Sequence, residues 1–288
     1  MLLSKWAKHY FRWRYERVVK FFFNKSFIIA EIGINHMGSL SKAKKLVDSA
    51  IRAGVSAVKF QTYKTEKRVN FSKNNKIFKI LKKCELSDKN FSKLKKYCDN
   101  KKITFFSTPF DISSALFLDS IGVKIFKIAS FDIANIKFLK KISKFKKIFI
   151  LSTGMASEKE IKKAVAIFKK NKRQLILLHC ISSYPNKEEN SNLACINTLK
   201  KFGVPVGLSD HTNDIFVPTI AKAMGVNVIE KHFMINKNDK CVDSSVSITE
   251  KQMSLLVKNL DRIEKVIGDS KLKLRDSEKN SIIFKRKS

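Results

Sequence analysis

Polar and ionisable side chains follow eight short apolar runs of the sequence, and the cations among them suit an anionic ligand. Lys59 and Lys127 each lie near the end of such a run. A lysine beside hydroxyl groups can hold a phosphate or a carboxylate through charge-assisted hydrogen bonds. The sequence therefore predicts an anion-binding cradle built from these two lysines and four hydroxyl groups. The hydroxyl groups are those of Thr108, Ser130, Ser152 and Ser209.

Two histidines, His211 and His232, come directly after neighbouring runs and could bind one divalent metal ion. A single histidine at a strand end is more often fixed by a hydrogen bond than bound to a metal, and a buried structural role suits His179. Two at adjacent strand ends leave both roles open. Two imidazoles with water would form an open site, which suits polarising a carbonyl group better than holding a structural ion.

Glu31 and Asp132 are the carboxylates expected to lie nearest the chemistry. At a buried strand end either group can titrate near neutral pH and transfer protons. The alternative for one of them is an ion pair with Lys59 or Lys127. Glu31, Asp132 and Lys59 are therefore the candidate catalytic residues.

The elements that must position these residues alternate between strand and helix patterns. Several runs are nearly continuous in apolar residues, as buried parallel strands are. Eight such units in about 240 residues predict an α/β protein with a single (β/α)8 TIM barrel, whose chemistry lies at the carboxyl ends of its strands. Two doubly wound domains are the alternative, but no Gly-x-Gly-x-x-Gly follows a strand and no linker divides the chain. The expected strands are 27–32, 55–60, 103–107, 123–128, 147–152, 174–179, 204–208 and 226–232, and the clearest helices are 41–54, 87–101, 113–120, 157–170 and 215–225.

Charge is the outlier of the composition. The 288 residues include 59 Lys or Arg and 25 Asp or Glu, which gives a formal net charge of +34. The lysines are spread over expected outer helix faces, so we expect a solvated basic surface and no nucleic-acid partner. No apolar run reaches the roughly 18 residues of a membrane span. The five cysteines are odd in number and form no Cys-x-x-Cys pair, which is typical of a reduced, cytoplasmic protein.

Residues 1–25 differ from the rest of the chain because they mix cations with tryptophan, tyrosine and phenylalanine. They do not read as a secretory signal, since charges interrupt the apolar stretch. Two roles remain open for this basic aromatic N-terminal extension. It could lie on an anionic membrane surface as a peripheral contact, or it could cap the bottom of the barrel.

Seven blocks of the sequence resemble, in order, the barrel of the sialic acid (nonulosonic acid) synthases. The resemblance covers about residues 27–268 and implies a (β/α)8 barrel, in agreement with the strand count. It also implies an enzyme, a transferase that condenses phosphoenolpyruvate with an N-acetylated hexose and releases phosphate. The blocks are 29–38 (IAEIGINHMG), 58–61 (VKFQ), 107–111 (STPFD), 127–130 (KIAS), 152–155 (STGM), 207–211 (GLSDH) and 230–233 (EKHF).

The resemblance also implies roles for individual residues. Lys59 and Lys127, with the hydroxyl groups of Thr108, Ser130, Ser152 and Ser209, would hold phosphoenolpyruvate. His211 and His232 would bind Mn2+ or Mg2+. A homodimer is the assembly that the family implies. The residues expected to contact the sugar are Glu31, Gln61, Tyr184 and Asp243.

Three departures from the family pattern affect these expectations. Asp132 stands where sialate synthases usually have Glu, and its side chain is one methylene shorter. The segment 242–247 (VDSSVS) resembles the pseudaminic acid synthase branch, as do Phe131 and Ser182. Family members normally continue into a C-terminal antifreeze-like domain, whereas this chain ends at Ser288, about where that linker would begin.

The expected organisation is therefore an extension over 1–25, a synthase barrel over 26–270 and a tail over 271–288. The expected function is a pseudaminic acid synthase-like condensation. The alternatives are an N-acetylneuraminate or legionaminate synthase, or a non-catalytic barrel that depends on a partner for its C-terminal domain.

Overall fold

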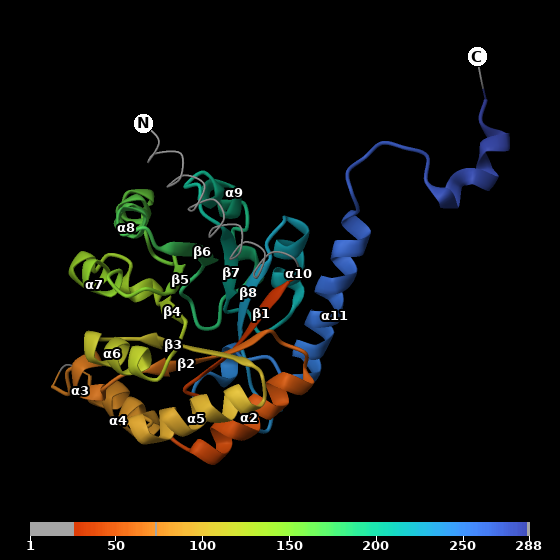
Figure 1. Ribbon diagram of the computed structural model, residues 1–288. Coiled ribbons are helices and arrows are strands. Elements are labelled where there is room, and N and C mark those ends of the chain that lie inside the picture. Colours follow the sequence, from red (N-terminus) through yellow and green to blue (C-terminus); the bar gives the residue numbers. More distant parts are fainter. Residues whose placement is uncertain (1–25, 73, 287–288) are drawn as a thin grey trace.

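The computed structural model describes residues 26–72 and 74–286, and its centre is a closed barrel of eight parallel strands (Figure 1). Each strand pairs with the next in chain order, and β1 pairs with β8. The prediction of a (β/α)8 barrel is confirmed. The prediction for residues 1–25 lies outside the described residues. The strands are β1 (Phe27–Gly33), β2 (Ala57–Thr62), β3 (Thr104–Pro109), β4 (Ile125–Ile128), β5 (Ile148–Ser152), β6 (Gln174–Cys180), β7 (Val206–Asp210) and β8 (Val228–His232).

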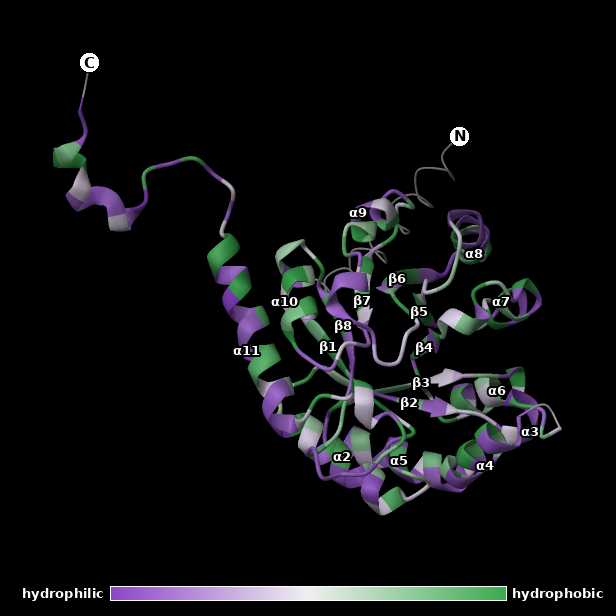
Figure 2. Ribbon diagram, turned by 180° about the vertical axis from the view of Figure 1, so that it is seen from behind, coloured by the Kyte–Doolittle hydropathy of each residue, from purple (hydrophilic) through white to green (hydrophobic). Residues whose placement is uncertain are grey.

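Helices form an outer ring around these strands (Figure 1). Most of these helices contain both hydrophilic and hydrophobic residues (Figure 2), as expected where one face of a helix covers the barrel and the opposite face meets water. The helices are α2 (Leu40–Arg52), α3 (Thr65–Arg68), α4 (Asn75–Cys84), α5 (Asp88–Asn100), α6 (Ile112–Ser120), α7 (Ile136–Ile142), α8 (Glu158–Lys170), α9 (Cys195–Lys200), α10 (Phe216–Ala223) and α11 (Glu250–Ile267), with the 3₁₀ helices η1 (Ser130–Asp132), η2 (Glu188–Asn190), η3 (Ser244–Val246) and η4 (Asp276–Phe284).

Short polar side chains fix where several helices begin. Ser39 precedes α2 and accepts a hydrogen bond from the Lys42 backbone N–H. Ser157 and Glu160 form a reciprocal capping box at the start of α8. These contacts satisfy N–H groups that a helix leaves without partners in its first turn.

Four strands, β2, β4, β7 and β8, begin two residues later than the sequence pattern predicts, and β2 and β4 show the reason. The expected strands start at Val55 and Val123, but β2 and β4 start at Ala57 and Ile125. Both valines are buried, which explains the apolar pattern. Their N–H groups bond back to the preceding helices, at Ala50 and Leu118, and so cannot join the sheet. Burial therefore begins before strand pairing does.

Alternation along each strand separates residues that face the mouth from residues that face the helices. In β8, Glu230 contacts lysines of other strands across the barrel, whereas Lys231 between Glu230 and His232 pairs with Asp210 at 2.7 Å. Lys231 is therefore a structural cation on the side of the barrel wall that faces the helices. The register of β8 decides which of its three polar residues can meet a ligand.

The last described elements lie at one side of the barrel. Helix α11 packs beside α10 and α2, and the segment after it, including η4, runs away from the barrel in both views (Figures 1 and 2). In the described part of the chain no helix combines the length and the apolar character needed to cross a membrane. All five cysteines are free thiols.

Gly207 in β7 tests the packing of the barrel interior. A Cβ at this position would lie 2.5 Å from both Leu178 Cδ2 and Val228 O. Because such overpacking strains the surrounding strands, we expect Gly207→Ala to lower the free energy of unfolding by about 1–3 kcal/mol. Urea unfolding followed by circular dichroism measures the loss. Leu116→Ala, at an exposed site on α6, is the control, and equal stability of the two variants would contradict this packing.

Candidate active site

Four buried charged side chains meet at the carboxyl ends of the strands. Lys59 Nζ lies 2.7 Å from Glu31 Oε2 and 3.7 Å from Glu230 Oε2. Lys127 Nζ lies 3.6 Å from Glu230 Oε1. Two lysines and two glutamates thus form one network, in which Glu230 bridges the two cations. The ion pair considered as an alternative for Glu31 is present, with Lys59 as its partner.

The pKa values of these groups reflect burial opposed by pairing. Burial raises the pKa of Glu31 despite the nearby Lys59. Burial also acts to raise the pKa of Glu230, but attraction by Lys127 and Lys59 outweighs it and lowers that pKa. Burial lowers the pKa of Lys127, whereas the two glutamates outweigh burial at Lys59 and raise its pKa. Glu31 is therefore the member of the network that most readily takes up a proton.

Three of the predicted hydroxyl groups join the same network. They lie on β3, β5 and β7, so residues far apart in the sequence surround the two ammonium groups. The sequence prediction that lysines and hydroxyls share one cradle agrees with this placement. The contacts are Lys59 Nζ to Thr108 Oγ1 at 3.4 Å, Lys127 Nζ to Ser152 Oγ at 2.7 Å and Ser209 Oγ to Glu230 Oε1 at 2.8 Å.

The fourth hydroxyl, that of Ser130, belongs to an adjoining polar cluster around Gly154. The Gly154 N–H donates to Ser130 Oγ at 3.1 Å, and Ser130 Oγ donates to Cys180 Sγ at 3.6 Å. A Cβ on residue 154 would collide with the hydroxyls of Ser182 and Ser130. The Ser182 hydroxyl is buried and has no hydrogen-bond partner within the described residues. The close packing of these hydroxyls therefore requires glycine at position 154.

Three of the four predicted sugar-contacting residues converge above Gly33. A Cβ on this glycine would lie 3.1–3.3 Å from Glu31 Oε1, Gln61 Nε2 and Asp243 Oδ2. Gln61 Nε2 donates to Glu31 Oε1 at 3.2 Å, and Asn35 Oδ1 accepts from the Asp243 N–H at 2.9 Å. The glycine, with φ of +53°, leaves space in front of two carboxylates and an amide. Two carboxylate acceptors beside an amide N–H donor suit the hydroxyls of a sugar.

The two histidines predicted to bind a metal are neighbours. The ring centroids of His211 and His232 lie 5.4 Å apart, and the Tyr184 ring lies against His211 at an interplanar angle of 36°, with centroids 4.1 Å apart. His211 Nδ1 lies 2.7 Å from Ile181 O, so Nδ1 carries a proton and the neutral ring keeps a lone pair on Nε2. Burial acts to lower the pKa of His211, but the neighbouring Cys180 outweighs it and raises that pKa. His232 Nδ1 is buried without a hydrogen-bond partner, 3.5 Å from Asp243 Oδ2.

These histidines fit an open metal site, although their number is small. Burial lowers the pKa of His232 well below its usual value, so its imidazole is neutral, the form that binds metals. Over the described ranges, no group of three or more His, Cys, Asp or Glu side chains is arranged to hold an ion. The remaining ligands would have to be water or substrate oxygens.

Asp132 lies apart from the lysine cradle. It ends η1, after β4, and its side chain is half-buried. Burial raises its pKa to about 6, although the positive charge of Arg68 acts to lower it. Asp132 therefore lies at the same mouth as the other catalytic candidates, Glu31 and Lys59, but forms no direct hydrogen bond with them.

The sequence patterns assign no site role to three residues of the mouth. Glu230 lies inside a recognised block, but only the alternation along β8 shows that it faces the cradle. Ser182 lies in the loop after β6, and only the three-dimensional structure places its hydroxyl beside Gly154. Arg68 lies on α3, a four-residue helix without an apolar pattern. Its guanidinium donates to Gln61 Oε1 at 3.0 Å, and no sequence signal marks it.

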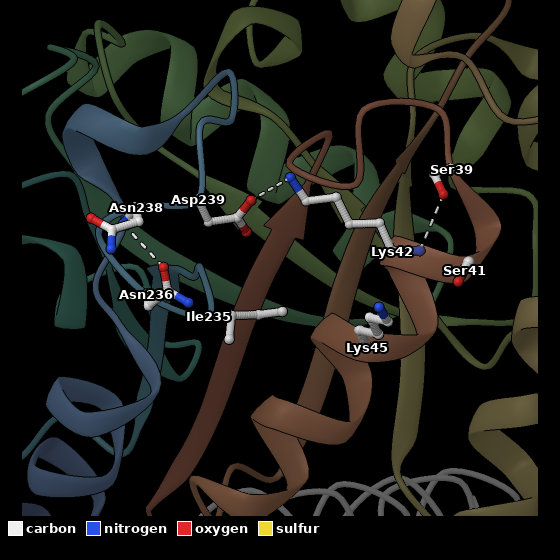
Figure 3. A pocket seen from close by; sticks show the side chains of 8 residues that line it. All are labelled: Ser39, Ser41, Lys42, Lys45, Ile235, Asn236, Asn238 and Asp239. Carbon is white, nitrogen blue, oxygen red and sulfur yellow. Dashed lines mark hydrogen bonds and ion pairs between the residues drawn. The ribbon is translucent and has the colours of Figure 1, made fainter.

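A separate hollow lies beside the start of α2 and the loop after β8 (Figure 3). Lys42 pairs with Asp239 across it at 2.5 Å. None of the residues predicted to act in catalysis or binding lines this hollow. The other lining residues are Ser39, Ser41, Lys45, Ile235, Asn236 and Asn238.

Comparison with known proteins identifies the family. Residues 46–272 match the NeuB family. The chain is 39% identical to the N,N'-diacetyllegionaminic acid synthase of Campylobacter jejuni, over 92% of this chain and 84% of that protein. It is 37% identical to a pseudaminic acid synthase of the same species, over 91% and 80%. The crystal structure of an N-acetylneuraminic acid synthetase from Leptospira borgpetersenii, in complex with citrate, has a TM-score of 0.85 and 42% identity, covering 90% of this chain and 91% of that chain.

The chain therefore belongs to the NeuB family of sialic acid synthases. The prediction of the family and of the enzyme class, a transferase of the sialic acid synthase type, is confirmed. The leaning towards pseudaminic acid is not resolved, because relatives named for legionaminic and pseudaminic acid are almost equally similar.

The unusual carboxyl group of Asp132 can be observed directly. We expect one carboxyl resonance in a ¹³C NMR titration to have its midpoint at about pH 6, because burial disfavours the carboxylate. An unperturbed Asp titrates near pH ~3.9. The Asp132→Asn variant should lack this resonance and keep the others. If the Asp132→Asn variant instead lacks only a carboxyl resonance that titrates near pH ~4, the burial of Asp132 is contradicted.

Proposed function

We propose that the chain condenses phosphoenolpyruvate with the open-chain form of an N-acetylated hexose to make a nonulosonic acid and free phosphate. The supporting observation is the pairing of two subsites in one mouth. A cradle of two buried lysines adjoins a cluster of two carboxylates and an amide above Gly33. The first suits a phosphorylated carboxylic acid and the second suits a polyhydroxylated acceptor.

Phosphoenolpyruvate would bind at the lysine cradle. Its phosphate and carboxylate would take the place of the glutamates as partners of Lys59 and Lys127, with hydroxyls of Thr108, Ser152 and Ser209 around them. Preorganised cations in a water-poor site stabilise charge that moves onto the leaving phosphate. Holding the two reactants side by side supplies much of the remaining rate gain.

The NeuB family depends on a divalent metal ion. His211 and His232 would hold Mn2+ or Mg2+, which would supply a Lewis acid for the sugar aldehyde. The C3 carbon of phosphoenolpyruvate would form a bond to the aldehyde carbon while the aldehyde oxygen takes up a proton and becomes a hydroxyl. Water would then add at C2 and lose a proton, and the C–O bond to phosphate would break. The Asp132 carboxylate accepts the proton of that water, so the rate rises with pH through about 6.

The acceptor we favour is the diacetamido trideoxyhexose used for pseudaminic acid, because segment 242–247 follows that branch. The specific observation for a second candidate, the legionaminic acid precursor, is the 39% identity to a synthase of that name. A non-catalytic barrel that depends on a partner is the third candidate, and activity of the purified chain alone separates it from both.

The direct test is phosphate release from phosphoenolpyruvate with a panel of N-acetylated hexoses. We expect release with Mn2+ and none in EDTA, and His232→Ala should abolish it because one metal ligand is lost. His179→Gln is the control, since His179 bonds to Ser191 O away from the mouth. Full turnover of metal-free protein, or no release with any sugar, would contradict the proposal.

The role of Lys127 in binding phosphoenolpyruvate can be separated from its role in folding. Lys127→Met leaves Glu230 paired with Lys59, so the chain should still fold. The loss of one charge-assisted hydrogen bond should raise the KM for phosphoenolpyruvate on the order of tenfold to a hundredfold, with little change in the KM for the sugar. The exposed Lys124 provides the control variant Lys124→Met. An unchanged KM for phosphoenolpyruvate would assign Lys127 to the fold alone.

A further inference from the structure

Arg68 is a cation in the sugar half of the mouth that no catalytic role uses so far. Its guanidinium carbon lies 3.7 Å from the ring centroid of Phe110 and 4.7 Å from that of Tyr63. One N–H donates to Gln61 Oε1 at 3.0 Å, and Gln61 in turn bonds to Glu31. Two rings and one amide therefore fix the plane of the guanidinium.

The hydrogen-bonding capacity of Arg68 is mostly unused. A guanidinium has five N–H donors, and within the described residues that of Arg68 makes one hydrogen bond. The charges of Asp243, Asp132 and Glu31 act on it, yet none of these carboxylates lies within 4 Å to form an ion pair. A half-buried guanidinium that uses one N–H within the described residues has donors left for the acceptor atoms of a ligand.

The surrounding groups restrict what that ligand can offer. Asp243, Glu31 and Asp132 are hydrogen-bond acceptors, so they suit the hydroxyl and amide N–H groups of an amino sugar. They repel a carbonyl oxygen, which can only accept. Arg68 is a strong hydrogen-bond donor among these carboxylates. The N-acyl carbonyl oxygen is the group of an N-acetylated sugar that needs such a donor.

We propose that Arg68 is a specificity-determining residue that donates hydrogen bonds to an N-acyl carbonyl oxygen of the acceptor sugar. The proposal rests on the proposed function, because it names the acceptor of that same site. It also specifies the substrate class further. The negative charges of Asp243 and Asp132 act on the guanidinium and would disfavour a phosphate group on the sugar bound here.

The test compares Arg68→Met with the matched control Lys67→Met. Lys67 is an exposed cation one residue earlier on α3, with its Nζ on Ser113 Oγ. Calorimetry measures the binding of two sugar pairs that differ by one N-acetyl group, N-acetylmannosamine against mannose and a diacetamido hexose against its monoacetamido counterpart. Turnover is measured separately by phosphate release.

Wild type and Lys67→Met should prefer the more acylated sugar in at least one pair. Arg68→Met should weaken binding of that sugar on the order of tenfold to a hundredfold, remove the preference and leave the KM for phosphoenolpyruvate unchanged. Arg68→Lys should restore only part of it, because lysine keeps the charge but loses the planar fork and its stacking on Phe110.

Equal weakening of both members of each pair, or no change in either, would overturn the role of Arg68. Absence of sugar binding by the wild-type chain would overturn it as well. If Arg68→Met does not fold, Arg68→Lys provides the test. Partial retention of the preference supports the role of Arg68, and full retention contradicts it. Binding that depends on Arg68 without any phosphate release would sustain this inference and reject the proposed function, whereas release without that dependence would do the opposite.

Discussion

The pairing of two buried lysines with two buried glutamates is the constraint on which the rest of the mouth depends. Ions removed from water are costly unless each has a partner in good geometry. The strand register supplies that geometry, since Glu31 lies opposite Lys59 and Glu230 lies opposite Ser209 in neighbouring strands. The closed barrel is what brings Lys127 of β4 to Glu230 of β8. The fold therefore holds two cations in one buried ion-pair network, and the proposed anionic substrate would bind by replacing the carboxylates.

The groups around Gly154 and those around Gly33 differ in their hydrogen-bonding chemistry. Above Gly154 lie hydroxyls and a backbone N–H, next to the lysines, which suits phosphate and carboxylate oxygens. Above Gly33 lie carboxylates and an amide, which suit hydroxyl groups. The two histidines stand beside the second region, with His232 near Asp243. This separation would orient the two proposed substrates towards each other.

Much of this arrangement is encoded locally, and the rest depends on three-dimensional register. Apolar runs followed by polar residues predict all eight strands and most of the mouth, because every strand of a barrel ends at one face. The boundary at Val55 was wrong because burial begins before sheet pairing. Glu230 could not be separated from Lys231 by type, since only their alternation decides which one enters the cradle. Arg68 depends on stacking against Phe110 of a distant loop, which no local pattern records.

The most direct measurement is a crystal structure with phosphoenolpyruvate, Mn2+ and the sugar alcohol of an N-acetylated hexose, which mimics the open chain but cannot react. We predict phosphate and carboxylate oxygens within hydrogen-bonding distance of Lys59 and Lys127, and hydroxyls of the sugar alcohol against Glu31 and Asp243. Ligands bound outside the barrel, for example in the hollow between Lys42 and Asp239, while both lysines remain paired only with glutamates, would contradict this prediction.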